Sequence, residues 1–238
     1  MQIQKILKNR WVKGLLKGIK YFFIVSISLT ILYKFIPVLG TPLMVQRGLE
    51  QSFGSRAYQF KKDWISLDQI SPHLVLAVLC SEDQNFLEHS GLDFEAIEDA
   101  MAYNERQKKL GKTKTRGAST ISQQTAKNVF LLPTRSWIRK GLEVYFTYLI
   151  EIIWSKRRIM EVYLNIIEIG NGIYGAEAAA QQFFNKKASQ LTKDEAALIA
   201  AVLPNPLGYN VAKPTSKLLR KKRWILRQME NNRNLIFE

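Results

Sequence analysis

Apolar residues recur every three or four positions along most of this chain, which is the spacing of one face of an α-helix. No stretch alternates between apolar and polar residues for long enough to predict a strand. The pattern therefore predicts a mainly α fold. The expected helices lie near residues 72–83, 94–106, 120–127, 137–153, 156–167, 176–184, 196–203 and 217–230.

Polar residues that favour helix N-termini stand before most of these segments. Thr192 and Glu195 have the spacing of a capping box, in which each side chain binds the backbone of the other. The other expected caps are Ser71, Asp93, Ser119, Ser136, Ser155 and Ser216.

The N-terminal region has a different pattern, with eight basic residues and no acidic residue before Glu50. An apolar run begins at Tyr21 and continues past Lys34 to residue 39. Residues 21–39 can span a bilayer, which needs about 20 residues, if the Lys34 side chain reaches the headgroups. Six Lys and Arg residues precede the run, which predicts a cytoplasmic N-terminus and an extracytoplasmic remainder. No small-residue cleavage site follows, which favours a retained anchor over a signal peptide.

These features divide the chain into four parts: a basic cytoplasmic tail (1–20), a transmembrane anchor (21–39), a linker (40–55) and one domain (56–238). Gly and Pro near residues 40–42 and 48–54 suggest the linker. The segment 107–118 has five basic residues and two glycines, and it predicts a mobile loop. A single cysteine, Cys80, excludes an internal disulfide.

The formal net charge of +15 indicates an anionic partner, which could be nucleic acid, acidic lipid headgroups or a phosphate-bearing substrate. Glu82 and Asp83 follow an apolar helix, where the helix dipole disfavours negative charge. Such a costly position suggests general acid or base chemistry, although a solvated helix end is an alternative. His89 has no second ligand at metal spacing, so a structural role is expected.

Two further segments could bind an anion. Residues 116–128 form a small-residue turn that leads into a helix N-terminus, where free N–H groups favour phosphate, and the spacing is not that of a nucleotide P-loop. Gln123, Gln124 and Lys127 lie within about one turn and could grip a sugar phosphate. Capped surface helices have the same pattern.

Arg135, Arg139 and Glu143 recur every four residues and lie on one helical stripe. This stripe suits a pyrophosphate or its metal ion, and it also suits a surface salt bridge.

Taken in order, these motifs resemble the peptidoglycan glycosyltransferases of glycosyltransferase family 51. The resemblance covers about residues 60–230, and because no transpeptidase domain follows, it is to the monofunctional class. Ser122 and Ala176 are minor departures from the family pattern. The motifs are EDxxFxxHxGxD from Glu82, GASTIxQQxxKN from Gly117, RKxxE from Arg139, KxxIxExYLN from Lys156 and GxxxYGAExAAxxFF from Gly170.

The resemblance implies a lysozyme-like, two-lobed α fold and polymerisation of lipid II with inversion at the donor carbon. It implies that Glu82 is the general base and that Glu143 is a second catalytic acidic residue, which organises nearby cations or a divalent ion, Mg²⁺ or Mn²⁺; no cofactor is firmly implied. Tyr163, Leu164 and Asn165 are expected to be structural. The substrate-binding residues implied are Asp83, Ser119, Gln123, Gln124, Lys127, Asn128, Arg135, Arg139 and Lys140.

The expected partners are lipid II, the growing lipid-linked strand, the membrane and other cell-wall synthesis or division proteins. The expected location is the bacterial cell (inner) membrane. Two rival hypotheses remain open. A lytic enzyme would also pair carboxylates beside a glycan, but it would not need cations for a phosphate leaving group. A nucleic-acid-binding module would explain the charge, but no readout motif is present and an extracytoplasmic domain would not meet nucleic acid.

Overall fold

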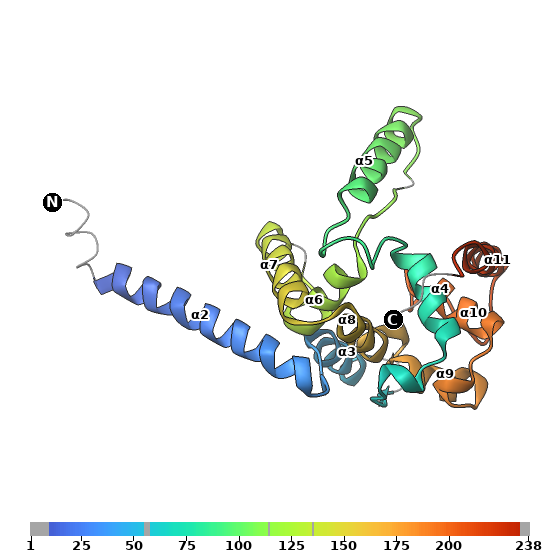
Figure 1. Cartoon of the computed structure of the whole chain (residues 1–238), viewed down its shortest axis with the longest axis horizontal. Coiled ribbons are helices and arrows are strands. Elements are labelled where there is room, and N and C mark those ends of the chain that lie inside the picture. Colours follow the sequence, from blue (N-terminus) through green and yellow to red (C-terminus); the bar gives the residue numbers. More distant parts are fainter. Residues whose placement is uncertain (1–9, 55–57, 114, 135, 234–238) are drawn as a thin grey trace. The chain divides into compact units, whose positions relative to one another are not determined.

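The computed structural model describes residues 10–54, 58–113, 115–134 and 136–233. The chain divides into two compact units, Met1–Pro37 and Val38–Glu238. Regular structure in the described residues is predominantly α-helical, which confirms the mainly α prediction (Figure 1).

The first unit contains one long helix, α2 (Arg10–Phe35). Its segment Trp11–Phe35 is long enough and apolar enough to cross a membrane. The length suffices because 25 helical residues, at about 1.5 Å each, exceed a hydrocarbon core of roughly 30 Å. The helix differs from the predicted span of 21–39 at both ends. It begins earlier, since lysine is a good helix former, and it ends before Pro37, whose ring disfavours helical geometry at the preceding residue.

The second unit begins with a helix that the sequence analysis missed. The prediction of an irregular linker over 40–55 is wrong for α3 (Pro42–Ser52), where Met44 is buried. The Thr41 hydroxyl accepts a hydrogen bond from the Met44 N–H at 3.3 Å, and Pro42 occupies the first helical turn. A Thr-Pro pair is a helix-start signal, which the nearby glycines obscured.

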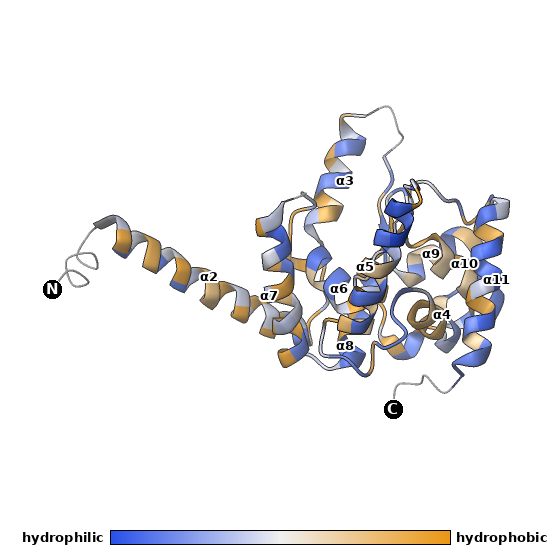
Figure 2. Ribbon diagram, turned by 90° about the horizontal axis from the view of Figure 1, so that it is seen from above, coloured by the Kyte–Doolittle hydropathy of each residue, from blue (hydrophilic) through white to orange (hydrophobic). Residues whose placement is uncertain are grey.

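Six of the described helices pack in two groups within the second unit. The first group buries apolar faces of three helices against one another, and α10 contributes four alanines whose small side chains allow close approach. Its members are α4 (Pro72–Glu82), α10 (Lys193–Val202) and α11 (Ser216–Asn231). The second group contains α6 (Ile121–Phe130), α7 (Trp137–Ile153) and α8 (Lys156–Ile166). Figure 2 shows hydrophilic and hydrophobic bands along α11, as its amphipathic sequence predicts.

Helix α5 (Phe94–Lys109) projects from the rest of the second unit (Figure 1). Its N-cap is Asp93, as predicted. The helix occupies the first residues of the segment predicted as a loop, 107–118. The Asn104 side chain holds the far end of this segment, because it accepts from the Arg116 N–H at 2.7 Å and donates to the Arg116 carbonyl at 2.9 Å. The mobility of the loop stays a prediction.

A small three-stranded sheet of order β1-β3-β2 corrects the expectation that the chain has no strands. Strand β1 (Lys61–Lys62) pairs in parallel with β3 (Ile173–Tyr174), and β3 pairs antiparallel with β2 (Glu168–Gly170). Strands of two or three residues are too short to show an alternating pattern, and both β2 and β3 are buried throughout. Helix α9 (Ala176–Phe184) follows the sheet.

Most of the predicted helix caps are confirmed, and two lie one residue away from the expected position. Ser136 and Ser155 cap α7 and α8 as predicted, as do Ser71 for α4 and the Thr192 capping box for α10. Thr120, not Ser119, caps α6, and Thr215, not Ser216, caps α11. Each correction selects the threonine of an adjacent Ser/Thr pair, and sequence alone cannot distinguish two neighbouring hydroxyls.

Candidate active site

Glu82 stands at the last position of α4, whose apolar face anchors it against the core. Its carboxylate accepts hydrogen bonds from the Ser81 hydroxyl and from the Gln124 side-chain N–H, both at 3.1 Å. Lys221 lies 4.0 Å away. The Glu82 side chain is 12% exposed, and this burial raises its pKa, although Lys221, Gln124 and Ser81 act in the opposite direction. A carboxylate with these neighbours is suited to accept a proton.

The Asp83 carboxylate accepts hydrogen bonds from other residues of the protein. It accepts from the Ile121 backbone N–H at 2.9 Å and from His89 Nε2 at 3.0 Å. Because the Gly91 N–H donates to His89 Nδ1, the ring proton must lie on Nε2 and face Asp83. Asp83 was expected to bind substrate. The structure instead gives it contacts that tie the end of α4 to the start of α6.

Close packing around Gly91 fixes the approach to α6. Gly91 has a φ of +97°, and a Cβ built there would lie 2.8 Å from the Thr147 methyl group. The Gly91 carbonyl accepts from the Thr120 hydroxyl at 2.6 Å. Only glycine tolerates both the backbone conformation and the contact, which gives a physical reason for the glycine in the EDxxFxxHxG motif.

The polar face predicted for α6 separates into residues that point inward and residues available to a ligand. Gln123 is buried, and its side chain accepts from the Thr120 N–H to complete a capping box. Asn128 is also buried, whereas Ser119 is exposed. Gln124 donates to Glu82 and accepts from the Tyr163 hydroxyl at 3.3 Å. Of the two glutamines predicted to hold substrate, Gln124 is the one that contacts the Glu82 carboxylate.

The cationic cluster consists of Lys127, Arg139, Lys140 and Glu143. Glu143 is 4% exposed, and it binds Arg139 at 3.0 Å and Lys140 at 2.6 Å through separate oxygens. Burial lowers the pKa of Lys127; Glu143 raises it, and the two neighbouring cations lower it. Three cations against one carboxylate leave an excess positive charge in the cluster. The buried Arg139 Nε has no partner among the described residues, so the cluster has a donor to offer to an anion.

The predicted divalent ion does not fit at Glu143. Both oxygens of this carboxylate already bind cationic side chains, and a metal ion would have to displace them while facing the remaining positive charges. Among the described residues, no group of three His, Cys, Asp or Glu side chains is arranged to hold a metal. Arg135, another predicted phosphate ligand, lies outside the described residues.

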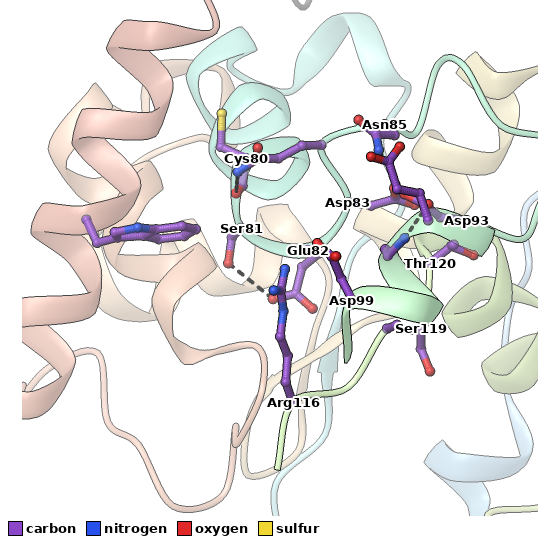
Figure 3. A pocket seen from close by; sticks show the side chains of 15 residues that line it. Cys80, Ser81, Glu82, Asp83, Asn85, Asp93, Asp99, Arg116, Ser119 and Thr120 are labelled. Carbon is purple, nitrogen blue, oxygen red and sulfur yellow. Dashed lines mark hydrogen bonds between the residues drawn. The ribbon is translucent and has the colours of Figure 1, made fainter. Parts of the chain in front are cut away.

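A cavity of about 270 Å³ opens beside Glu82. Its walls come from α4, the start of α5, the loop before α6, and α11, so residues far apart in sequence meet around it (Figure 3). Its polar lining includes Ser81, Glu82, Asp83, Asn85, Asp93, Glu95, Asp99, Arg116, Ser119 and Thr120.

Several site residues escaped the sequence analysis. Lys221 and Trp224 come from α11, where Trp224 lines the cavity and Lys221 faces Glu82. Burial lowers the pKa of Lys221, and Glu82 raises it. Their spacing of three residues puts them on one helix face. This shared face was the one sequence signal that could have indicated that they act together. The packing of that face against α4 could not be read from the helix alone.

Comparisons with known proteins identify the family. Residues 50–230 match the family described as Transglycosylase. The chain is 54% identical over 229 residues to the biosynthetic peptidoglycan transglycosylase of Bacteroides thetaiotaomicron, covering 96% of this chain and 88% of the relative. It is 50% identical over 222 residues to the protein of that name from Haemophilus influenzae, with coverage of 93% and 89%. The chain therefore belongs to the transglycosylase family and is a peptidoglycan glycosyltransferase.

Proposed function

We propose that the chain elongates glycan strands from lipid II with Glu82 as the general base. Glu82 takes the proton from the acceptor 4-hydroxyl, and the acceptor oxygen forms a bond to the anomeric carbon of the donor. The bond between that carbon and the pyrophosphate oxygen breaks on the opposite face, so the configuration inverts and lipid pyrophosphate leaves with the electron pair. The observation that carries this proposal is a carboxylate that is only 12% exposed, has a raised pKa, and has its nearest cation among the described residues, Lys221, 4.0 Å away.

The cationic cluster supports the second half of the reaction. Negative charge grows on the leaving pyrophosphate, and preorganised cations stabilise such charge strongly when they are partly buried. Lys127, Arg139 and Lys140 are proposed to bind the pyrophosphate. Arg135 is proposed as a further phosphate ligand from its sequence motif. Glu143 keeps Arg139 and Lys140 in position through its two ion pairs. We derive no step through a metal ion.

The proposed substrate contacts follow from which polar side chains are accessible. Gln124 and Ser119 are proposed to contact the sugars, since Gln124 is partly accessible and Ser119 is exposed in the cavity wall. Asp83 and Gln123 are proposed to position the site, because their polar atoms are engaged by the protein. Asn128 is buried, and its proposed contribution is to support Lys127 next to it.

A lytic function is less well supported by these contacts. A glycosidase needs two carboxyl groups that can act on one glycosidic bond. Asp83, Asp93 and Glu143 are the buried acids near the site, and each is held by two donors. Glu95 and Asp99 also line the cavity and are exposed. Glu82, whose pKa burial raises, is contacted instead by a hydroxyl, an amide and a lysine at 4.0 Å.

We further propose that α2 is a single-pass anchor with its N-terminus in the cytoplasm and the transglycosylase domain outside. The support is the basic residues that precede the apolar run, which favour the cytoplasmic side. The growing lipid-linked strand and other cell-wall synthesis proteins are the expected partners on the outer surface.

The test is incubation of the purified full chain with fluorescent lipid II in detergent, followed by gel separation of the products. The proposal expects a ladder of glycan strands that disappears when a transglycosylase inhibitor of the moenomycin type is added. Shortening of finished glycan, without elongation of lipid II, would contradict it.

A further inference from the structure

The Gln124 side chain lies between Glu82, the proposed base, and a buried tyrosine. The orientation of the Gln124 amide decides whether an N–H donor or a carbonyl oxygen faces the Glu82 carboxylate. Its N–H group faces the Glu82 carboxylate at 3.1 Å, and its carbonyl oxygen faces the Tyr163 hydroxyl at 3.3 Å. An ionised carboxylate can only accept hydrogen bonds. A flipped amide would point its oxygen at Glu82, and this arrangement would suit only the protonated acid. The amide orientation and the charge on Glu82 are therefore linked.

Tyr163 is built to hold one of these two orientations. It lies on α8 with none of its surface exposed, and its hydroxyl makes one hydrogen bond among the described residues, to Gln124. Burial, reinforced by Glu82 and Asp83, raises the pKa of Tyr163 well above its usual range. The hydroxyl therefore keeps its proton at any working pH and needs an acceptor, which the Gln124 carbonyl oxygen supplies. Flipping the amide would take that acceptor away inside the core, which is costly.

We propose that Tyr163 is a positioning residue for the polymerisation reaction: its hydroxyl fixes the Gln124 amide so that an N–H donor always faces Glu82. Tyr163 acts through Gln124 and does not touch the substrate. This chain of two hydrogen bonds, from Tyr163 to Gln124 and from Gln124 to Glu82, is called the relay below. It favours the ionised form of Glu82, which is the form that can take the proton from the acceptor hydroxyl. The inference rests on the proposed role of Glu82 as the base, and it replaces the purely structural role expected for Tyr163.

Other charged groups also act on Glu82, so the relay must be separated from them. Lys221 approaches from α11 at 4.0 Å, and Asp83 is adjacent on the chain. Lys127 interacts with Glu82 from α6, the helix that also carries Gln124. Substitution of Tyr163 by phenylalanine leaves all of these charges in place. A change in the titration of Glu82 would then come from the lost hydroxyl.

The experiment compares Tyr163→Phe with Tyr174→Phe in the full chain, using fluorescent lipid II and a pH–rate profile. Tyr174 is a matched control because it is also a buried tyrosine, and its hydroxyl has no partner among the described residues. Tyr163→Phe should lower kcat about fivefold at pH 7, the value of one lost hydrogen bond, with KM little changed. The acid limb of its profile should move to higher pH, since Glu82 becomes harder to ionise. Tyr174→Phe should leave both unchanged.

A double-substitution cycle tests whether Tyr163 works through Gln124. In a Gln124→Met background the amide is gone, so adding Tyr163→Phe should change kcat less than about twofold. An equal effect of Tyr163→Phe in both backgrounds, or an unmoved acid limb in the single variant, would overturn the relay. Glu82→Gln separates this failure from failure of the proposed function: if Glu82→Gln elongates strands normally, Glu82 is not the base, whatever Tyr163 does.

Discussion

Two buried glutamates near the cavity have opposite environments. Glu82 meets a hydroxyl, an amide and one lysine at 4.0 Å, and burial raises its pKa. Glu143 is bound by a guanidinium and an ammonium group at 3.0 and 2.6 Å. The surroundings of Glu82 suit a carboxylate that takes up a proton. Those of Glu143 suit a carboxylate that holds two cationic side chains in place. Residue type alone does not distinguish a base from an organiser of charge.

The largest expected effect is the loss of polymerisation activity in Glu82→Gln. The amide keeps the shape of the side chain but cannot accept a proton, and general-base catalysis is worth about 10²–10⁴-fold. Polymerisation of lipid II should fall by about that factor while the fold persists. Glu168→Gln is the matched control, because Glu168 is a buried glutamate whose pKa is also raised by burial, and it lies outside the cationic cluster. Equal losses in the two variants would point to general damage.

The next effect concerns the cations. Lys127→Ala removes a charge-assisted contact proposed for the pyrophosphate, so binding of the lipid II donor should weaken by about 10- to 100-fold. Unlike Glu82→Gln, this change should raise the donor concentration needed for half-maximal rate. Lys186→Ala, which removes a lysine paired with Glu195, provides the control. Unaltered donor binding in Lys127→Ala would remove Lys127 from the proposed pyrophosphate site.

Thermal stability should distinguish the two glutamates by the sign of the change. Because the folded-state pKa of Glu82 is raised, ionised Glu82 costs stability in full above that pKa. The cost decreases as pH falls below the folded-state pKa and is gone below the unfolded-state pKa. Glu82→Gln should therefore melt at a higher temperature than the wild type at pH 7, with the gain shrinking in acid. Glu143→Gln should melt at a lower temperature, since it leaves Arg139 and Lys140 without their shared anion. Calorimetric melts from pH 7 to pH 4 check both signs.

The smallest effect is expected from removing the first unit. Deleting residues 1–37 ends the cut at the boundary between the two units, whereas a cut after residue 45 would remove the Thr41 cap and part of α3. In detergent the shortened chain should elongate lipid II at a rate close to that of the full chain. In liposomes the rate should fall, because the anchor confines enzyme and substrate to one surface. Equal liposome rates would exclude this role of the anchor.

Local signals predicted much of the helical framework. Ser136 and Thr192 cap helices where their hydroxyls stand before apolar-periodic segments, and such caps involve only a few neighbouring residues. The α3 helix was missed because its Thr-Pro start signal lies among glycines that suggest a linker. The strands were missed because two or three residues are too few to show an alternating pattern. Strand β1, for example, pairs with β3 across more than 100 residues.

The site was predicted in part for the same reason. The motifs indicated Glu82 from its place at the end of an apolar helix and Arg139 and Glu143 from their spacing along α7, because both signals are visible in sequence. The contacts of Lys221 and Tyr163 with this site depend on how α11 and α8 pack against α4 and α6. Asp83 and Gln123 look like ligand residues in a motif, and the structure uses their polar atoms internally. Tertiary packing decides between these uses, and it is not a local property.

The most direct measurement sets Glu82→Gln beside Glu143→Gln, with lipid II turnover measured at saturating donor and donor binding measured by displacement of a fluorescent inhibitor of the moenomycin type. Glu82→Gln should bind the donor like the wild type and fail to elongate it even at saturation. Glu143→Gln should bind more weakly and still turn over when saturated. If Glu82→Gln instead elongates strands at a near-normal rate while Glu143→Gln binds donor and does not react, then Glu143 is the base and the assignment made from their environments is wrong.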